Sequence, residues 1–321
     1  MTVLILADDL DPTADGMVRE LVDRGAAVCR VNTGWFPAQL SISAELRGAS
    51  WCGHLRTPRH RVELEEITSV WFRSPTAFRF PEGWTRVERQ HSHNEAKFGL
   101  GGVLTSLPAF WVNHPNRVAD AVYKPNQLVV AAQVGMTVPD TLVTNEPEAV
   151  RRFAAGADDG SVITKTLGAA AITEEGRRKV TFTRRVPRAD LDDLAGVELT
   201  AHQFQRWVPK AYDVRVVVVG DHHWAVSITS DSESGRLDFR NDYDALNYEL
   251  IDESDEMHDG INRYMKRFGL VYGAFDFVVD HSGEWSFLEC NPGGQYGWLE
   301  AATGAPITAT LACLLAEGTS S

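Results

Sequence analysis

The sequence predicts an α/β protein whose C-terminal part is α+β, and three observations support this fold class. Short apolar strands alternate with helical patterns in the first third of the 321-residue chain, which is typical of a mostly parallel sheet. Longer apolar strands near the C-terminus are separated only by a short turn, which predicts a hairpin. Hydrophobic residues make up 44% and charged residues 23% of the chain, the balance of a globular protein with two or three packed units.

Residues 1–115 are expected to form an N-terminal α/β domain. Gly25 ends the first helical pattern, and Asn113–Asn116 is a turn that closes the domain. The expected strands are Val3–Leu6, Ala27–Val31, Trp51–Leu55, Val70–Phe72 and Ala109–Val112, and the expected helices are Pro12–Arg24 and Val87–Leu107.

Two further units follow, a central domain at 116–200 and a C-terminal domain at 201–321. In the central domain we expect helices at Arg117–Val134, Pro147–Ala155 and Arg188–Leu194 and strands at Val138–Val143, Ser161–Lys165 and Lys179–Val186. In the C-terminal domain we expect strands at His202–Val208, Asp213–Val219 and Trp224–Thr229, a polar loop at Asp231–Asn241, an amphipathic helix at Glu256–Phe268, and a hairpin of Tyr272–Val279 with Trp285–Cys290.

Charge and composition exclude several functions. The formal net charge of −13 argues against general binding of nucleic acid or of an anionic membrane surface, since both need clustered cations. No apolar stretch is long enough to span a bilayer, and none has the form of a signal peptide. The four cysteines are scattered, which predicts reduced thiols in a cytoplasmic protein.

Familiar catalytic motifs are missing or incomplete. The sequence has no phosphate-binding G-x-x-x-x-G-K-[ST] loop and no G-x-S-x-G elbow. His91 and Glu95 can share a helix face, but a solvated surface is the favoured interpretation over a metal site. His222 and His223, at an expected hairpin turn, are interpreted in the same way.

Two acidic residues interrupt the apolar strands of the C-terminal hairpin. Asp276 lies in Ala274–Val279 and Glu289 in Phe287–Asn291, and pairing of these strands brings the two carboxylates together. Asn291, two residues after Glu289, shares its strand face. Such oxygens suit Mg²⁺ bound with nucleotide phosphates. A structural salt bridge to a nearby arginine explains the acids equally well at this point.

Basic and polar residues upstream add a possible nucleotide site. Lys165 ends a strand before a loop of small residues, and Lys124 lies on the preceding helical segment, so both can contact phosphate. Each lysine alone is better explained as a solvated cation. The extended segment Gln205–Val208 can offer backbone groups to an adenine edge. Asp213 can accept ribose hydroxyls, and Arg215 shares its strand face.

The order of these residues resembles the ATP-grasp fold over nearly the whole chain, with an N-terminal pre-grasp domain. Four motifs more narrowly resemble the ATP-grasp maturases of ribosomally made peptides, the microviridin-type or graspetide ligases. The motifs are Val70–Pro75 (VWFRSP), Gln205–Lys210 (QRWVPK), Asp238–Arg240 (DFR) and Phe287–Trp298 (FLECNPGGQYGW).

The resemblance implies ATP and Mg²⁺ as cofactors and gives each residue a role. Lys124 and Lys165 would contact the phosphates, and Gln205 with the backbone of Arg206 and Val208 would bind adenine. Asp213 would bind the ribose. Mg²⁺ would be held by Asp276, Glu289 and Asn291. Arg215 and Arg240 would neutralise the γ-phosphate and an acyl phosphate. Arg206 stands where the family often has glutamate, which leaves the backbone carbonyl to accept from the adenine amino group.

The implied partner is a precursor peptide with a leader and an acidic core that contains Thr, Ser or Lys. Its side-chain carboxylates would become acyl phosphates and then intramolecular esters or amides. Arg73 is a candidate for binding the core, or equally a partner of a structural carboxylate. The leader-binding region corresponds to Lys179–Leu194, where Asp190, Asp192 and Asp193 either bind a basic leader residue or form a solvated acidic turn. A homodimer is also implied.

Two alternatives remain at this stage. The first is an ATP-grasp ligase that adds amino acids to a protein tail or joins small molecules. The second, from a different class, is a nucleotide-binding regulator without turnover. ATP-dependent change in the mass of a peptide distinguishes the proposed maturase from both.

Overall fold

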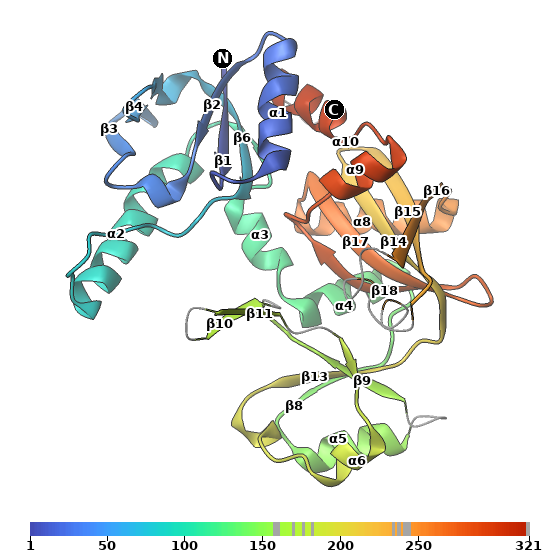
Figure 1. Ribbon diagram of the computed structural model, residues 1–321. Helices are drawn as coiled ribbons and strands as arrows, with labels where there is room; N and C mark the ends of the chain where they lie inside the picture. The colour runs from blue at the N-terminus through green and yellow to red at the C-terminus, as the bar shows by residue number, and fades with distance from the viewer. Residues whose placement is uncertain are drawn as a thin grey trace.

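The computed structural model describes residues 1–156, 161–168, 171–174, 177–180, 183–232, 235, 239 and 245–318. Three units are visible in Figure 1: the N-terminal unit, the C-terminal sheet with its helices, and a central unit that carries α5 and α6 at the bottom of the view. No helix among the described residues combines the length and the apolar character needed to cross a membrane.

The N-terminal unit is built on a parallel sheet, as predicted. Its strand order is β2-β1-β6-β7, and all three neighbouring pairs run parallel. Alternate residues of β1 face opposite layers: Ile5 packs with Met17 of α1, and Leu4 packs with Leu100 of α2. The elements are β1 (Thr2–Ala7), α1 (Pro12–Asp23), β2 (Ala27–Val31), β6 (Ile67–Ser74), α2 (Arg86–Thr105) and β7 (Phe110–Val112), with 3-10 turns at Thr33–Trp35 and Leu64–Glu66.

A second, antiparallel sheet in this unit was not predicted. It has the order β3-β4-β5 and contains β3 (Ser41–Arg47), β4 (Ser50–Arg56) and β5 (Arg61–Glu63). The expected strand Trp51–Leu55 therefore belongs to this sheet and not to the parallel one. Most side chains of β3 are polar or half-exposed, so the apolar alternation that identifies a strand is weak there.

The central unit is a four-stranded antiparallel sheet of order β12-β9-β13-β8. Val150 and Ala154 of α5 pack against Phe204 of β13 in its small core. The single strand expected at Lys179–Val186 is wrong, because Lys179 belongs to the β10–β11 hairpin and residues 184–185 pair instead with β9. The elements are β8 (Thr141–Thr144), α5 (Pro147–Ala155), β9 (Val162–Lys165), β10 (Ala171–Glu174), β11 (Arg177–Val180), β12 (Arg184–Arg185), α6 (Arg188–Asp192) and β13 (His202–Arg206), with a 3-10 turn at Val197–Leu199.

The C-terminal unit is a five-stranded antiparallel sheet of order β16-β15-β14-β17-β18, with helices on both faces. Val216 and Val218 of β14 face α8, α3 and α4, whereas Val217 and Val219 face α9 and α10. The elements are α3 (Pro115–Ala121), α4 (Lys124–Gln133), β14 (Lys210–Val219), β15 (His222–Ser230), β16 (Leu246–Ile251), α8 (Asp255–Phe268), β17 (Tyr272–Asp280), β18 (Trp285–Asn291), α9 (Gly297–Thr303) and α10 (Ile307–Glu317).

Packing crosses both of the predicted domain boundaries. Residues of α3 and α4 join the core of the C-terminal sheet, although they were assigned to the central domain. Strand β13, beyond the expected boundary at residue 200, pairs with β8 and β9 of the central sheet. The boundaries at 116 and 201 themselves stay predictions.

Candidate nucleotide and magnesium site

The two hairpin acids meet as the sequence predicts. Asp276 of β17 is directly opposite Glu289 of β18 and also opposite Arg215 of β14. Arg215 donates from one guanidinium nitrogen to both Asp276 oxygens, at 3.0 and 3.2 Å. Burial disfavours the charge on Arg215, but the combined effect of Asp276, Tyr272 and Glu289 outweighs burial, so the pKa of Arg215 is above its usual value. The structural salt bridge considered for Asp276 is therefore present.

A β-bulge sets which side chains of β18 face this site. Asp276 pairs with Glu289 but Phe277 pairs with Phe287, so Leu288 is an extra residue on β18. Leu288 and Glu289 both line the cleft, whereas Phe287 and Cys290 pack toward α8. Burial raises the pKa of the Cys290 thiol well above its usual value. A neutral thiol on the far face is no competing ligand for the cleft.

Lys124 and Lys165 lie in the same cleft as the acids. Lys124, at the first residue of α4, contacts Glu289 with 2.9 Å between Nζ and Oε2 and donates to the Thr166 carbonyl, also at 2.9 Å. Its side chain is 19% exposed, so the lysine is neither solvated nor isolated. Lys165 is the last residue of β9 and lines the same space.

The Gln205–Val208 segment forms another wall of the cleft. Gln205 is fully buried, and its side chain donates to Thr141 Oγ1 at 2.9 Å. The backbone N–H of Arg206 donates to Asp140 O at 2.9 Å. The backbone carbonyl of Arg206 is therefore the group that can accept a hydrogen bond from a purine amino group. The Arg206 guanidinium lies over the Phe153 ring, 4.5 Å from its centroid.

Asp213 lines the cleft with a basic partner that sequence reasoning missed. Lys210 Nζ donates to both carboxylate oxygens of Asp213, at 2.7 and 2.6 Å. Lys210 and Asp213 are three positions apart in the sequence, and this spacing was the available signal. Other unrecognised wall residues are Pro139, Ile163, Phe239, Val278 and Leu288. Such apolar side chains suit the faces of a planar base.

Arg73 lies outside this cleft, as a buried bridge between units. Its Nε donates to Asp11 Oδ2 at 3.0 Å, and one terminal nitrogen donates to the carbonyls of Gly293 and Gly294, both at 3.1 Å. The other terminal nitrogen contacts Gln295. Its side chain is 2% exposed. These contacts favour the structural alternative for Arg73.

The other candidate residues divide into two groups. Arg240 lies outside the described residues, so its part in the site stays a prediction. The three acids proposed for leader binding are on or next to α6, and none lines the cleft. Asp190 pairs with Arg184 at 2.8 Å, whereas Asp192 and Asp193 are exposed.

Two acids in the cleft, with Asn291 beside them, fit the magnesium ion that the fold implies. Asp276 and Glu289 supply two carboxylates whose side chains are 14% and 13% exposed. Asn291 Nδ2 donates to Asp276 at 3.4 Å, which leaves its amide oxygen as the atom that can bind a cation. Two carboxylates and an amide oxygen are hard ligands of the kind that Mg²⁺ takes together with phosphate.

Comparison with known proteins agrees with this geometry. A family described as the MvdD pre-ATP grasp domain matches residues 2–119. No curated protein matches the chain. Macrocyclase MdnC from Microcystis aeruginosa MRC, crystallised with precursor peptide MdnA, is 30% identical, with a TM-score of 0.88 over 99% of this chain and 100% of MdnC.

Two further solved structures are similar over nearly their whole length. A RiPP-associated ATP-grasp ligase from Chryseobacterium gregarium, in complex with ADP and a leader and core peptide, is 27% identical, with a TM-score of 0.91 and coverage of 99% and 97%. Macrocyclase MdnB from Microcystis aeruginosa MRC is 28% identical, with a TM-score of 0.82 and coverage of 98% of each chain. With these similarities and the assembled cleft, the chain belongs to the ATP-grasp macrocyclase family that modifies ribosomally made precursor peptides.

Proposed function

We propose that this chain is an ATP-dependent ligase that closes side-chain ester or amide crosslinks within a ribosomally made precursor peptide. A peptide carboxylate attacks the γ-phosphate of ATP, which gives an acyl phosphate and ADP. A hydroxyl or amine of the same peptide then attacks the acyl carbon and expels phosphate. Each crosslink forms with the net loss of one water from the peptide.

One observation carries this proposal: a single cleft is lined by Lys124, Lys165, the segment Gln205–Val208, Asp213 and the two hairpin acids. The residues come from α4, the central sheet and the C-terminal sheet. Only the complete fold brings them together, so their convergence supports nucleotide binding more strongly than any single residue does. The macrocyclases similar over the whole chain support a peptide as the carboxylate substrate.

The protein's part in this chemistry is to position groups and to balance charge. Lys124 and Lys165 would hold phosphates and Asp213 the ribose, while Asp276, Glu289 and Asn291 would hold Mg²⁺. The bound Mg²⁺ would supply charge neutralisation at the phosphates. Arg215, fixed by Asp276, and Arg240 would face the developing charge on the transferred phosphoryl group. No residue of the chain needs to act as a covalent nucleophile.

Peptide recognition extends the proposal beyond the cleft. The leader would contact the central unit in the region Lys179–Leu194, where β12 is an edge strand of its sheet and can accept an extended segment. A homodimer is part of the same proposal. All four cysteines are free thiols, which fits the proposed cytoplasmic location.

The test uses the purified chain, ATP, Mg²⁺ and the peptide encoded beside its gene. Mass spectrometry measures the loss of about 18 Da for each bond formed, the mass of one water. The matched variants are Glu289→Ala, which removes a proposed Mg²⁺ ligand, and Glu256→Ala, which removes an exposed glutamate on α8. We expect dehydration by the wild type and by Glu256→Ala, and none by Glu289→Ala.

Other outcomes contradict the proposal and select an alternative. ADP release with a different carboxylate and amine, without any change in the peptide, indicates a small-molecule or tail-adding ligase. ATP binding without turnover on any of these substrates indicates the regulator. If the Glu289→Ala variant still dehydrates the peptide, Glu289 is not required for the chemistry.

A further inference from the structure

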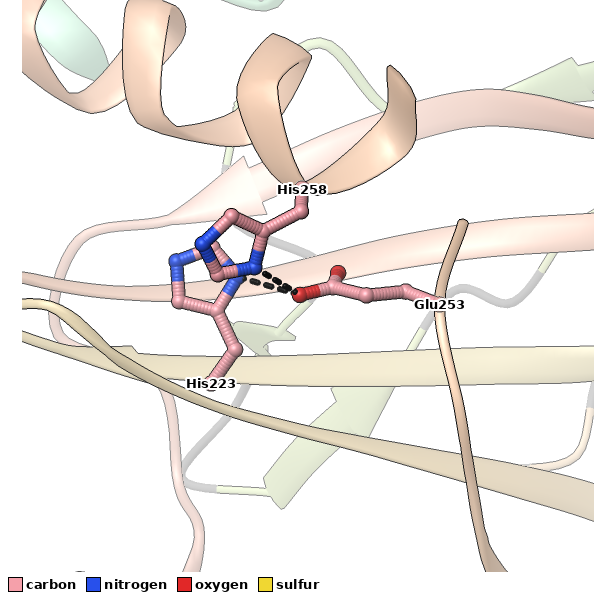
Figure 2. A group of neighbouring side chains, drawn as sticks. All are labelled: His223, Glu253 and His258. Atoms are coloured by element: carbon pink, nitrogen blue, oxygen red, sulfur yellow. Dashed lines mark hydrogen bonds and ion pairs between the residues drawn. The ribbon is translucent and has the colours of Figure 1, made fainter. Parts of the chain in front are cut away.

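Two histidines and a glutamate meet in the C-terminal unit, away from the nucleotide cleft. His223 lies on β15, Glu253 follows β16, and His258 is in the first turns of α8 (Figure 2). Oε1 of Glu253 is 2.6 Å from Nδ1 of His223 and 2.7 Å from Nδ1 of His258. Sequence reasoning took His222 and His223 for solvated residues at a turn. That is wrong for His223, whose backbone pairs within the sheet and whose side chain is only 4% exposed.

The cluster is on the opposite face of the sheet from the nucleotide cleft. His223 is directly opposite Val218 of β14, and Val218 packs in the α8 layer. Arg215 and Asp213 lie an odd number of positions from Val218 on β14, so their side chains point to the other face of the sheet. None of the three cluster residues lines the nucleotide cleft. The cluster is therefore a separate feature and not an outer part of the magnesium site.

The chemistry of the cluster matches that of a transition-metal site. Two imidazole nitrogens and one carboxylate oxygen converge, and these ligand types suit Zn²⁺. The other ring nitrogen of His223, Nε2, is 3.1 Å from Asn262 Oδ1. An outer hydrogen-bond partner of this kind fixes the orientation of metal-binding histidines.

One carboxylate oxygen of Glu253 lacks a partner, and a bound cation would supply one. The Glu253 side chain is only 9% exposed, and Oε2 has no hydrogen-bond partner among the described residues. One oxygen of the Glu253 side chain is thus left without a donor in a largely buried place.

We propose that His223, Glu253 and His258 form a binding site for a divalent transition metal of the Zn²⁺ class. Without metal, protons on the Nδ1 atoms hold the same three groups together as hydrogen bonds. Metal binding displaces those protons, and the ligand atoms need to separate by less than about 1 Å to accept metal–ligand distances near 2 Å. The fourth position is open on the side of half-exposed His258.

Such a metal would link three segments that are distant in sequence. It would join the start of β15 and the segment after β16 to the beginning of α8, and α8 covers the core of the C-terminal sheet. The expected role is structural, because the cluster lies on the reverse face from the ATP site. Zinc should therefore raise the melting temperature of the folded chain.

The test measures zinc bound to the chelator-treated full chain, with Mg²⁺ in excess to occupy hard-ligand sites. We expect one zinc per chain by elemental analysis and a zinc-dependent rise in melting temperature. His258→Ala and Glu253→Gln should weaken zinc binding by about tenfold or more, since each removes one of three ligands. His91→Ala, which removes an exposed histidine from α2, is the matched control and should bind zinc like the wild type.

A second measurement needs no variant. Co²⁺ added to the wild-type chain should give the visible absorption of a four-coordinate nitrogen and oxygen site, and zinc should abolish it. Equal zinc affinity in the wild type and His258→Ala would overturn the proposal. A wild-type chain that takes up no zinc and gives no Co²⁺ spectrum would overturn it as well.

Discussion

At the scale of residues, the proposed nucleotide site is a set of opposite charges held in pairs. Lys124 contacts Glu289, Arg215 contacts Asp276, and Lys210 contacts Asp213. Each pair places a cation at a defined position in a chain with a net charge of −13. The local cations explain how a strongly acidic protein can accept the phosphates of a nucleotide.

Removing the charge of Glu289 tests its place in the proposed magnesium site. Glu289→Gln keeps the shape of the side chain but removes one hard anionic ligand. We expect peptide dehydration to slow by about 10²-fold or more, with only a small change in melting temperature. Glu256→Gln on the surface of α8 is the control. Equal rates for the two variants would exclude Glu289 as a ligand.

Asp213→Asn separates nucleotide binding from chemistry. The ribose is remote from the transferred phosphoryl group, so its contacts are the same in ground and transition states. Loss of a charged hydrogen bond worth about 1.5–3 kcal/mol should raise the KM for ATP by about 10-fold or more while kcat stays close to that of the wild type. Steady-state kinetics of ADP release measures both, with Asp221→Asn on the β14–β15 turn as control. A fall in kcat at constant KM would contradict the ribose assignment.

The site residues could be predicted from the sequence where several of them serve the same function. The acids in apolar strands predicted their own convergence, because an isolated buried carboxylate is unfavourable. Some partners were missed. Lys210 lies three positions before Asp213 on β14, a spacing that was available in the sequence, and His223 was assigned to solvent. The environment of His223 depends on strand register and on the packing of α8, which local sequence does not encode.

At the scale of elements, the β17–β18 hairpin and the loop after it shape the site. The bulge at Leu288 turns Leu288 and Glu289 toward the cleft together, which strict alternation would not do. After β18 the chain passes close to β17 at Gly294. A Cβ at this glycine would lie 2.6 Å from Ala274 Cβ and 2.8 Å from Arg215 Nη2.

Gly294→Ala should therefore disturb Arg215 without changing any charge. Either the loop or the guanidinium must shift, so we expect peptide dehydration to fall by about tenfold or more, since small displacements of a positioned group are costly. Gly16→Ala on α1 is the control, because nothing lies within 4 Å of its Cβ and alanine favours a helix by about 0.5–1 kcal/mol. Wild-type activity in Gly294→Ala would show that this close approach is unimportant for Arg215.

Elements with strong periodicity were predicted well, and edge elements were not. The parallel strands β1, β2 and β6 and the β17–β18 hairpin follow the apolar patterns. Strand β16 was missed because its side chains alternate between half-exposed and exposed, so no residue of it marks a buried face. The end of β11 and β12 were merged into one expected strand, Lys179–Val186, and β10 was not expected, because sequence does not show which sheet a short polar strand joins.

At the scale of the whole molecule, distant parts of the chain share one core. Helix α10, near the C-terminus, packs with α1 and with β1 in the same cluster. Arg73 adds a polar link between the parallel sheet and the loop that follows the β17–β18 hairpin. The N-terminal unit therefore helps to hold the loop beside Arg215 in place.

Arg73→Ala should destabilise the chain more than it changes substrate recognition. The Arg73 and Asp11 side chains are 2% and 6% exposed, and breaking a buried pair from one side costs about 3–5 kcal/mol. We expect a lower melting temperature, measured by differential scanning calorimetry. Arg86→Ala, which removes an exposed arginine at the start of α2, should melt like the wild type. Equal melting of both variants, with peptide affinity lost only in Arg73→Ala, would favour the core-binding role.

The most direct test of the account follows the oxygen atoms of the peptide carboxylates. The precursor peptide is labelled with ¹⁸O in its side-chain carboxyl groups and incubated with the chain, ATP and Mg²⁺. Because the acyl phosphate loses a carboxylate oxygen to phosphate when the crosslink closes, the account predicts one ¹⁸O in the phosphate released per crosslink. Crosslinked peptide accompanied by unlabelled phosphate would contradict activation of the carboxylate by phosphorylation.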